Sequence, residues 1–587
     1  MSEIKPSPNG GNFDLKRSYW IAIALVVIIV VGGAGVYLFM RPPPISNLIV
    51  MGTTDSIETV LDPARAYDYF GWSMIGALGS GLVDIDPGST AAPDDIIPSL
   101  ASSWTVSGAG TIYDFTLKQG LIFADGTPFN STVVKYTFDR CCNLTGDGIY
   151  HEEGFQRGIG LADIIDNVTI TGEYTVRFYL TIPWAPFLQT MAAQGCFIVH
   201  PNYAPMGELV NYTAGNARAS YAVGLGPYLL QSWSRTGGTD EEIVLVRNPN
   251  YWDAANGIPM TDTFIIKFYE TDTALATAMT AGEIDVAYRQ LSATQINAFR
   301  ANPNVRVWEA AGPFIQYMCF QQEIYPFNET LIRRGIAAAL NRTNLVNTVF
   351  LGTAQPLYTI IPDGMAYHKP SFEIHGEANY TYTQTVFDLF GYNASNKLVI
   401  EMYYESSGHY PQSAEQAAVY KSDLEASGVM TVNLNGLEWA SYRSARSAGT
   451  MPVYVYGWYP DYIDPDNYAF LPFAEWLNMG YNATYPAGGV QQYNLWVWGR
   501  SNTSDSGRQT SYYALQDLQA QECSAIPLYQ GGAYAVSKTT IHGIILDITI
   551  NFRHWLIYWG APATTGPFLA LQTNEVSVIR YPGKFDN

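Results

Sequence analysis

A stretch without charged residues near the N-terminus, residues 18–40, constrains the fold of this chain most strongly. Its apolar run WIAIALVVIIVVGGAGVYLFM matches the roughly 20 residues that cross about 30 Å of hydrocarbon as a helix. Lys5, Lys16 and Arg17 precede this run, and Arg41 is the only basic residue that follows it closely. The positive-inside rule then places the N-terminus in the cytoplasm. We predict a single-pass anchor in the cell membrane with an extracellular body.

A cleaved secretory signal is the alternative to a retained anchor. The apolar run is longer than a typical signal core, and neither a small-x-small cleavage site nor a lipid-accepting Cys follows it. The N-x-S/T sequons all lie beyond the span, which agrees with an extracellular body and predicts possible N-glycosylation. These sequons are at Asn130, Asn143, Asn167, Asn211, Asn328, Asn341, Asn379, Asn393, Asn482 and Asn502.

Length and composition predict a folded protein of more than one lobe. The chain has 587 residues, too many for one hydrophobic core. Because 48% of the residues are hydrophobic and 14% are charged, disorder of the body is excluded. The net charge of -21 and the lack of a Lys/Arg cluster exclude nucleic acid as a partner.

The five cysteines indicate neither a metal site nor a defined disulfide framework. They form no CxxC pair, and no His lies at metal-ligand spacing from them. An odd count leaves at least one thiol without an intramolecular partner, and buried thiols are as consistent with the sequence as a bridge. The residues are Cys141, Cys142, Cys196, Cys319 and Cys523.

Short strand-like and helical patterns alternate through the body and predict a mixed α/β protein. Residues 113–117 and 176–180 are typical of strands. Helical spacing of apolar residues runs through 331–351 and again through 414–428, where Gly428 is suited to end the helix before the next strand. No fixed-period repeat occurs, so a solenoid or propeller is disfavoured.

Ordered motifs along the body carry a family resemblance. DGTPF at 125–129 is typical of a stiff turn between Phe123 and Phe129, and RNPNYW at 247–252 places large anchors after a turn; both indicate scaffold. The further segments are LDPARAYD at 61–68, GLVDID at 81–86, PSLASSW at 98–104, YDFTLKQGLIFADGTPFNSTVVKYTFDR at 113–140, GPYLLQSW at 226–233, AGEIDVAY at 281–288, IRRGIAAALNRTNLV at 332–346, GWYPDYIDPDNY at 457–468 and IPLYQ at 526–530. Together they resemble the extracellular solute-binding proteins of family 5, the dipeptide- and oligopeptide-binding proteins of ABC importers.

The resemblance implies a two-lobed periplasmic-binding-protein-like fold (type II, peptide-binding cluster) with an extra subdomain. It also implies a ligand enclosed between the lobes, hinge closure, and docking on a permease driven by ATPase subunits. The expected organisation is a cytoplasmic N-terminus at 1–17, the anchor at 18–40, a Pro-rich spacer at 41–47, lobe I at 47–310 with a subdomain near 85–205, lobe II at 311–524, and a return to lobe I at 525–587.

GWYPDYIDPDNY differs from the scaffold motifs because three carboxylates stand beside aromatic residues. A carboxylate in a partly dry cleft binds an ammonium, and aromatic rings add cation-π contact. In the relatives an aspartate of this segment holds the peptide's N-terminal ammonium, which corresponds here to Asp461; Trp458, Tyr459 and Tyr462 are the other expected ligand contacts. Asp464 and Asp466 are expected to cap a turn.

The expected function is therefore peptide capture for import. An oligosaccharide is the alternative ligand, because aromatic rings stack on sugars, and a surface sensory or structural role is a further alternative. An enzyme is not expected: neither HExxH nor GxSxG occurs, and no cofactor or metal is implied. No basic residue for a ligand carboxylate can be assigned from the sequence.

Overall fold

The computed structural model describes residues 47–58, 60–87, 96–151, 154–210, 222–484, 486–549 and 551–560. The chain divides into two compact units, residues 1–47 and 48–587, and the second unit contains the helices and strands of the body. The predicted membrane span at 18–40 lies outside the described residues. Within the described part, no helix combines the length and apolar character that a membrane crossing requires.

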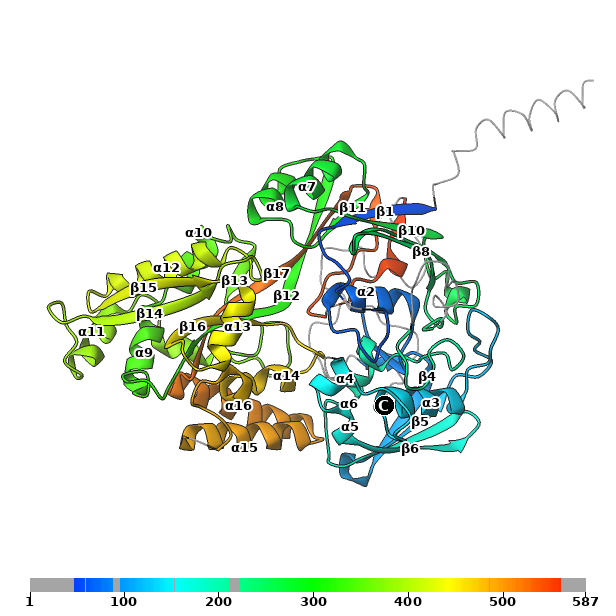
Figure 1. Ribbon diagram of the computed structural model, residues 1–587, viewed down its shortest axis with the longest axis horizontal. Coiled ribbons are helices and arrows are strands. Elements are labelled where there is room, and N and C mark those ends of the chain that lie inside the picture. Colours follow the sequence, from blue (N-terminus) through cyan, green and yellow to red (C-terminus); the bar gives the residue numbers. More distant parts are fainter. Residues whose placement is uncertain are drawn as a thin grey trace, which may run out of the picture. The chain divides into compact units, whose positions relative to one another are not determined.

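One large mixed sheet continues through the body. Its order is β15 (Met430–Leu437), β14 (Leu398–Glu405), β16 (Val453–Trp458), β12 (Val305–Phe320), β17 (Ala525–Lys538), β11 (Val286–Tyr288), β1 (Leu48–Thr53), β10 (Thr263–Phe268), β9 (Thr239–Arg247) and β8 (Tyr228–Thr236), with β13 (Ala354–Pro356) paired to β17. The long antiparallel strands β12 and β17 join the half that contains β14–β16 to the half that contains β1 and β8–β11 (Figure 1).

Smaller sheets and short helices complete the architecture. An antiparallel sheet has the order β4 (Ala101–Ser107), β5 (Ile112–Leu117), β7 (Thr175–Leu180) and β6 (Ile165–Gly172); β2 (Val83–Ile85) pairs with β3 (Ile96–Pro98), and β18 (Ile541–His542) with β19 (Tyr558–Trp559). The helices are α2 (Tyr69–Leu78), α3 (Ser131–Cys141), α4 (Phe155–Gly158), α5 (Leu161–Ile164), α6 (Phe187–Met191), α7 (Asp272–Ala281), α8 (Ala293–Arg300), α9 (Thr330–Ala339), α10 (Arg342–Thr348), α11 (Tyr380–Asp388), α12 (Ser413–Ala426), α13 (Trp439–Ser447), α14 (Asp466–Ala469), α15 (Ala487–Ser501) and α16 (Asp505–Glu522).

Local sequence patterns account for many of these elements. The strands predicted at 113–117 and 176–180 are confirmed as β5 and β7, and helix α12 ends just before Gly428, whose φ is 78°. At DGTPF, Gly126 adopts a φ of 88° between the buried Phe123 and Phe129, as expected of a scaffold corner. The prediction of one helix through 331–351 is wrong, because α9 ends at Ala339 and Asn341 caps a second helix, α10.

The two crossing strands bend where small residues allow their backbones to approach. The register between β12 and β17 shifts between Ala311 and Ile315. A Cβ added at Gly312 would lie 2.8 Å from the carbonyl oxygen of Gly531. Position 312 therefore has no room for a side chain larger than that of glycine. The register shift lies where the two halves of the sheet meet.

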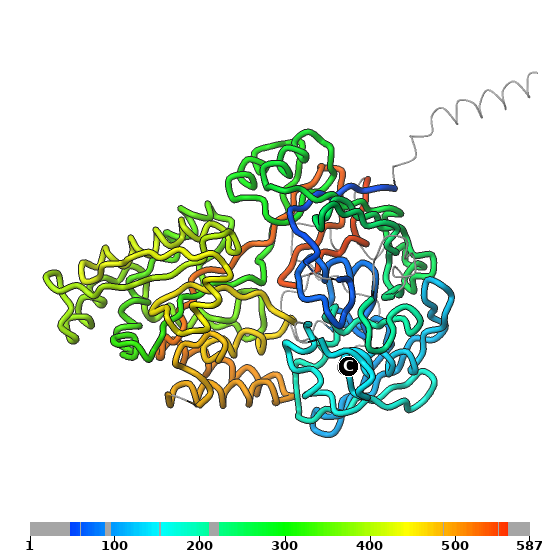
Figure 2. Tube along the Cα trace, viewed as in Figure 1, coloured from blue at the N-terminus to red at the C-terminus, as the bar shows by residue number. Residues whose placement is uncertain are grey.

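The two ends of the described chain lie side by side, as Figure 2 shows for its blue and red segments. Trp559 donates its indole N–H to the carbonyl of Leu48 at 2.9 Å. The last segment thus returns to the first strand, after β17 has passed beside β11.

The structure shows the burial of the cysteines and of most sequon asparagines. All five cysteines are buried and free. Of the sequon asparagines, Asn130, Asn341 and Asn379 cap helices with their side chains, whereas Asn211 lies outside the described residues. Exposed sequon positions are Asn143, Asn167, Asn328, Asn379 and Asn393. Glycosylation stays a prediction.

Candidate ligand-binding site

A cavity of about 710 Å³ lies between segments from the two halves of the large sheet. One side is formed by residues within 55–58 and 67–72 and by the turn after β11. The other side is formed by Phe314, the start of α13 and the segment 456–461 that leaves β16. Its size is within the range of small-molecule sites. The segment that the sequence singled out therefore lies in a cavity large enough for a ligand.

Asp461 lines this cavity and is held by neighbours on both sides of it. The Tyr67 hydroxyl donates to Asp461 Oδ1 at 2.6 Å, although the two residues are 394 positions apart. Asn467 donates its amide to Oδ2 at 3.2 Å and accepts the Asp461 backbone N–H at 2.7 Å. Two side chains, one from each side of the cavity, thus hold the carboxylate in position.

Asp461 is a buried acid without a cationic partner among the described residues. Asp461 is 8% exposed, and this burial raises the pKa of its carboxyl group. The hydrogen bonds from Tyr67 and Asn467 oppose that shift. Burial and the same carboxylate raise the pKa of Tyr67 well above 10, which keeps the phenol a proton donor. A carboxylate in this state gains most from a cation brought to it by a ligand.

Aromatic rings form one wall of the cavity. Trp458 stacks on Trp476 with ring centroids 5.6 Å apart, and Trp476 meets Tyr456 at 5.5 Å. His409 stacks on Trp439 at 3.6 Å, and burial lowers the pKa of His409. The wall offers flat ring faces for stacking, and the Arg446 guanidinium lies against two of them, with its centre 5.3 Å from the Tyr456 ring and 5.1 Å from the Trp476 ring.

Three of the four residues expected to contact ligand line the cavity. Trp458, Tyr459 and Asp461 do so, and Tyr459 is 45% exposed. Tyr462 is 5% exposed, does not line this cavity, and donates its hydroxyl to Asp466 at 2.6 Å. The structure thus assigns Tyr462 a contact inside the loop, because the chain turns after Asp461.

Buried ion pairs hold the loop that carries Asp461. Asp464 Oδ1 accepts the backbone N–H of Asp466 at 2.8 Å, as expected for a turn cap, and also receives the Arg508 guanidinium at 2.5 Å. Arg500 Nε lies 3.5 Å from Asp466 Oδ1. The local sequence predicted that Asp464 caps a turn. It did not predict the contacts with Arg500 and Arg508, because these residues belong to the later helices α15 and α16.

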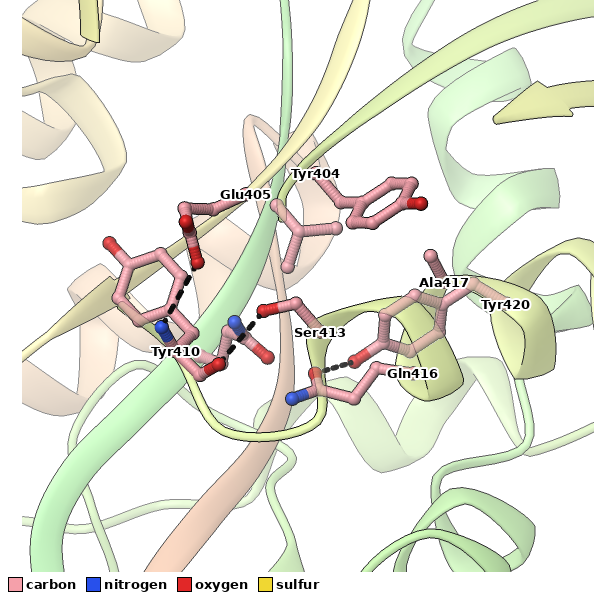
Figure 3. A pocket seen from close by; sticks show the side chains of 9 residues that line it. Tyr404, Glu405, Tyr410, Ser413, Gln416, Ala417 and Tyr420 are labelled. Atoms are coloured by element: carbon pink, nitrogen blue, oxygen red, sulfur yellow. Dashed lines mark hydrogen bonds between the residues drawn. The ribbon is translucent and has the colours of Figure 1, made fainter. Parts of the chain in front are cut away.

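Gly457 lets strand β16 pass close to the cavity floor. A Cβ at this position would lie 2.6 Å from the ring of Phe314 and 2.8 Å from that of Tyr410. Tyr410 is in turn fixed by a polar cluster behind the wall, where its N–H donates to Glu405 and its carbonyl accepts from Ser413 (Figure 3). The space in that cluster is about 10 Å³, close to the volume needed for one water.

Comparison with known proteins identifies the fold and the family. Residues 95–476 match the family described as bacterial extracellular solute-binding proteins, family 5 Middle. The chain belongs to this family. The match spans more than half of the chain and includes both Asp461 and the aromatic wall.

Individual family 5 relatives resemble this chain at low identity. The probable D,D-dipeptide-binding periplasmic protein DdpA of Escherichia coli (strain K12) is 26% identical over 515 residues, covering 85% of this chain and 92% of its own. The di/tripeptide-binding protein 2 of Pseudomonas aeruginosa (strain UCBPP-PA14) is 26% identical over 430 residues, covering 71% of this chain and 77% of its own.

Solved structures share the two-lobed α/β fold. DppA from Helicobacter pylori, in complex with the peptide STSA, gives a TM-score of 0.67 at 21% identity over 87% of this chain and 98% of its own. NikA from Brucella suis, in complex with Fe(III)-EDTA, gives a TM-score of 0.74 at 18% identity over 87% of this chain and 100% of its own. The predicted two-lobed α/β fold of the body is therefore confirmed.

Proposed function

We propose that this family 5 protein is the substrate-binding component of an ABC importer and captures peptides in the cavity that contains Asp461. The carrying observation is a buried carboxylate that faces the cavity, is fixed by Tyr67 and Asn467, and has no cation beside it in the described structure. An α-ammonium supplies that cation. The names of the relatives, two of which are dipeptide- or di/tripeptide-binding proteins, support the same ligand class.

The segments that line the cavity suggest how ligand binding promotes closure. Tyr67 lies on one side and Asp461 on the other, and Tyr69 meets the ring of Tyr459 edge-on at 6.0 Å. A ligand favours closure only through contacts with both sides. The division into lobe I at 47–310 and 525–587 and lobe II at 311–524 belongs to this proposal.

The test begins with native mass spectrometry of the purified body to identify any retained ligand. Calorimetry follows, with free and N-acetylated forms of the same peptide. Removing one partner of a buried charge pair costs about 2–5 kcal/mol, so Asp461→Ala is expected to weaken binding by about 30-fold or more. Acetylation should weaken wild-type binding comparably and change little in the variant.

Glu58→Gln is the matched control. Glu58 lines the same cavity but is exposed, so this variant removes the same charge without removing the anchor. Its expected affinity is close to that of wild type. Unchanged binding of free and acetylated peptides by Asp461→Ala would refute the ammonium anchor.

An oligosaccharide remains the second candidate ligand, because Trp439, Trp458 and Trp476 all line the cavity and present stacking faces. A retained neutral sugar in the mass spectrum, with no peptide binding, would select it. A surface sensory or structural role would be favoured if no permease or ATPase genes lie beside this gene.

We further propose that residues 18–40 anchor the protein in the cell membrane, with the body outside. Support comes from the uncharged span and its basic flank. Protease added to intact cells should then digest the body and leave a small membrane fragment. A body that resists digestion, or that washes off the membrane, would refute the anchor.

A further inference from the structure

A contact outside the ligand cavity joins the four-stranded sheet β4–β5–β7–β6 to the loop that carries Asp461. Trp184, in the segment between β7 and α6, meets the ring of Tyr462 edge-on, with the ring centroids 5.8 Å apart. Tyr462 follows Asp461 directly in the sequence. Because neither ring lines the cavity, this contact holds the binding loop from behind and leaves the space for a ligand unchanged.

The segment that presents Trp184 is short and stiff. Pro183 precedes it and Pro186 follows two positions later, and each proline fixes its own φ. The Trp184 carbonyl accepts the backbone N–H of Phe187 at 3.2 Å and the hydroxyl of Tyr113, in β5, at 3.4 Å. The sheet therefore holds the backbone at position 184 through contacts of its own.

The end of α15 supplies the other half of the contact. The last four carbonyls of a helix have no partner within the helix. The carbonyl of Arg500, one residue before the end of α15, accepts the N–H of Ala185 at 2.7 Å, and Figure 1 shows α15 beside the segment that leads into α6. The Arg500 guanidinium carbon lies 5.8 Å from the Trp184 ring. A backbone hydrogen bond and a cation-π contact thus join α15 to this segment.

The contact is closely packed. Trp184 is fully buried, and its Nε1 has no hydrogen-bond partner among the described residues, so the indole acts through its rings. At a neighbouring turn Gly110 has a φ of 94°. A Cβ added there would lie 2.7 Å from Cγ2 of Thr503, which lies between α15 and α16. The turn therefore approaches the α15–α16 connection too closely for a larger side chain.

The same contact is linked to the loop by charge. Arg500 Nε lies 3.5 Å from Asp466 Oδ1, so one arginine contacts both the loop and the indole of Trp184. In the proposed division into lobes, Trp184 belongs to the subdomain of lobe I, whereas Tyr462 and Arg500 belong to lobe II. Opening of the cavity then has to separate these groups, and their attraction stabilises the closed arrangement.

We infer that Trp184 and Ala185 form a latch with Tyr462 and Arg500, which holds the two lobes together through protein contacts alone and slows the release of a bound ligand. This inference rests on the proposed function, because lobe movement and peptide capture belong to it. It gives the additional sheet a role in retaining the ligand.

The first test measures hydrogen exchange of the Ala185 amide in the full-length protein without ligand. Gly110→Ala places a Cβ against Thr503, and a clash of this kind should speed exchange by about 10-fold. Gly126→Ala is the matched control, because its φ of 88° brings comparable backbone strain while no atom lies within 4 Å of the added Cβ. Its exchange should equal that of wild type. Gly110→Ala/Thr503→Ser removes the clashing methyl group and should restore slow exchange.

The second test measures the release of the dipeptide Ala-Phe by stopped-flow displacement. Trp184→Leu removes the ring packing without losing a hydrogen bond of the indole, and release should be about 10-fold faster than from wild type. Phe178→Leu is the control, since Phe178 is also fully buried in this sheet but contacts the rings of its own sheet and its helices. Its release rate should match that of wild type. If Trp184→Leu does not fold, Gly110→Ala takes its place.

The outcomes separate the latch from the proposed function. Equal exchange of the Ala185 amide in ligand-free wild type and Gly110→Ala would overturn the latch. Equal release of Ala-Phe from wild type and from both Gly110→Ala and Trp184→Leu would overturn its role in retaining the ligand. Failure of every peptide to bind would instead refute the proposed function, and the exchange measurement, made without ligand, would still decide whether the latch exists. Faster exchange and release in the latch variants, with both controls at the wild-type rates, supports the inference.

Discussion

Replacing Arg508 with methionine should destabilise the loop that carries Asp461. The Arg508 guanidinium lies 2.5 Å from Asp464 Oδ1, and the two side chains are 4% and 0% exposed. Methionine keeps much of the side-chain volume but leaves the Asp464 carboxylate buried with only the Asp466 N–H as a partner. Breaking a buried pair in this way costs about 3–5 kcal/mol.

Calorimetric unfolding measures this cost. With about 2.1 cal/mol/K of unfolding entropy per residue, a body of residues 48–587 loses roughly 1 °C in Tm per kcal/mol, so Arg508→Met should melt about 3–5 °C lower. Arg300→Met is the matched control, because Arg300 pairs with Glu309 at 2.8 Å with side chains 31% and 41% exposed. An exposed pair contributes about 0–1 kcal/mol, so its Tm should fall by about 1 °C or less.

A second substitution separates charge from packing. Asp464→Asn added to Arg508→Met removes the stranded charge, and the double variant should recover much of the lost stability. Equal Tm values for Arg508→Met and Arg300→Met, or no recovery in the double variant, would refute the reasoning that this ion pair holds the loop.

Two further results are expected. Burial raises the pKa of Asp461, and an ammonium binds only the ionised acid, so peptide affinity should fall as the pH is lowered through that pKa. Calorimetry at a series of pH values should show this loss of affinity for a free peptide and not for its N-acetylated form. Equal pH profiles for the two forms would contradict the prediction. Gly312→Ala should destabilise the protein by about 1–3 kcal/mol and reduce ligand-induced compaction in X-ray scattering, because the added Cβ would lie 2.8 Å from the Gly531 carbonyl. Gly531→Ala is its control, with the nearest atom at 3.4 Å, and equal behaviour of the two variants would exclude a tight bend.

Much of the local structure could be predicted because it depends on neighbours in the sequence. Strands β5 and β7, the corner at Gly126 and the end of α12 before Gly428 all follow from periodicity and turn residues. The break between α9 and α10 was missed, although Asn341 is a typical helix cap and gave a local signal. Apolar spacing alone therefore overestimates the length of a helix.

The sequence by itself determined the α/β class and the scaffold corners, since both depend on local patterns of residues. Its resemblance to family 5 singled out Asp461 as a candidate anchor. Only the tertiary structure decided what surrounds that anchor. Tyr67 contacts Asp461 across 394 positions, Arg508 contacts Asp464 across 44, and Arg289 after β11 contacts Asp55 after β1. No local spacing encodes these contacts, because the path of the backbone through β12 and β17 decides which distant side chains lie close together in the low-dielectric interior.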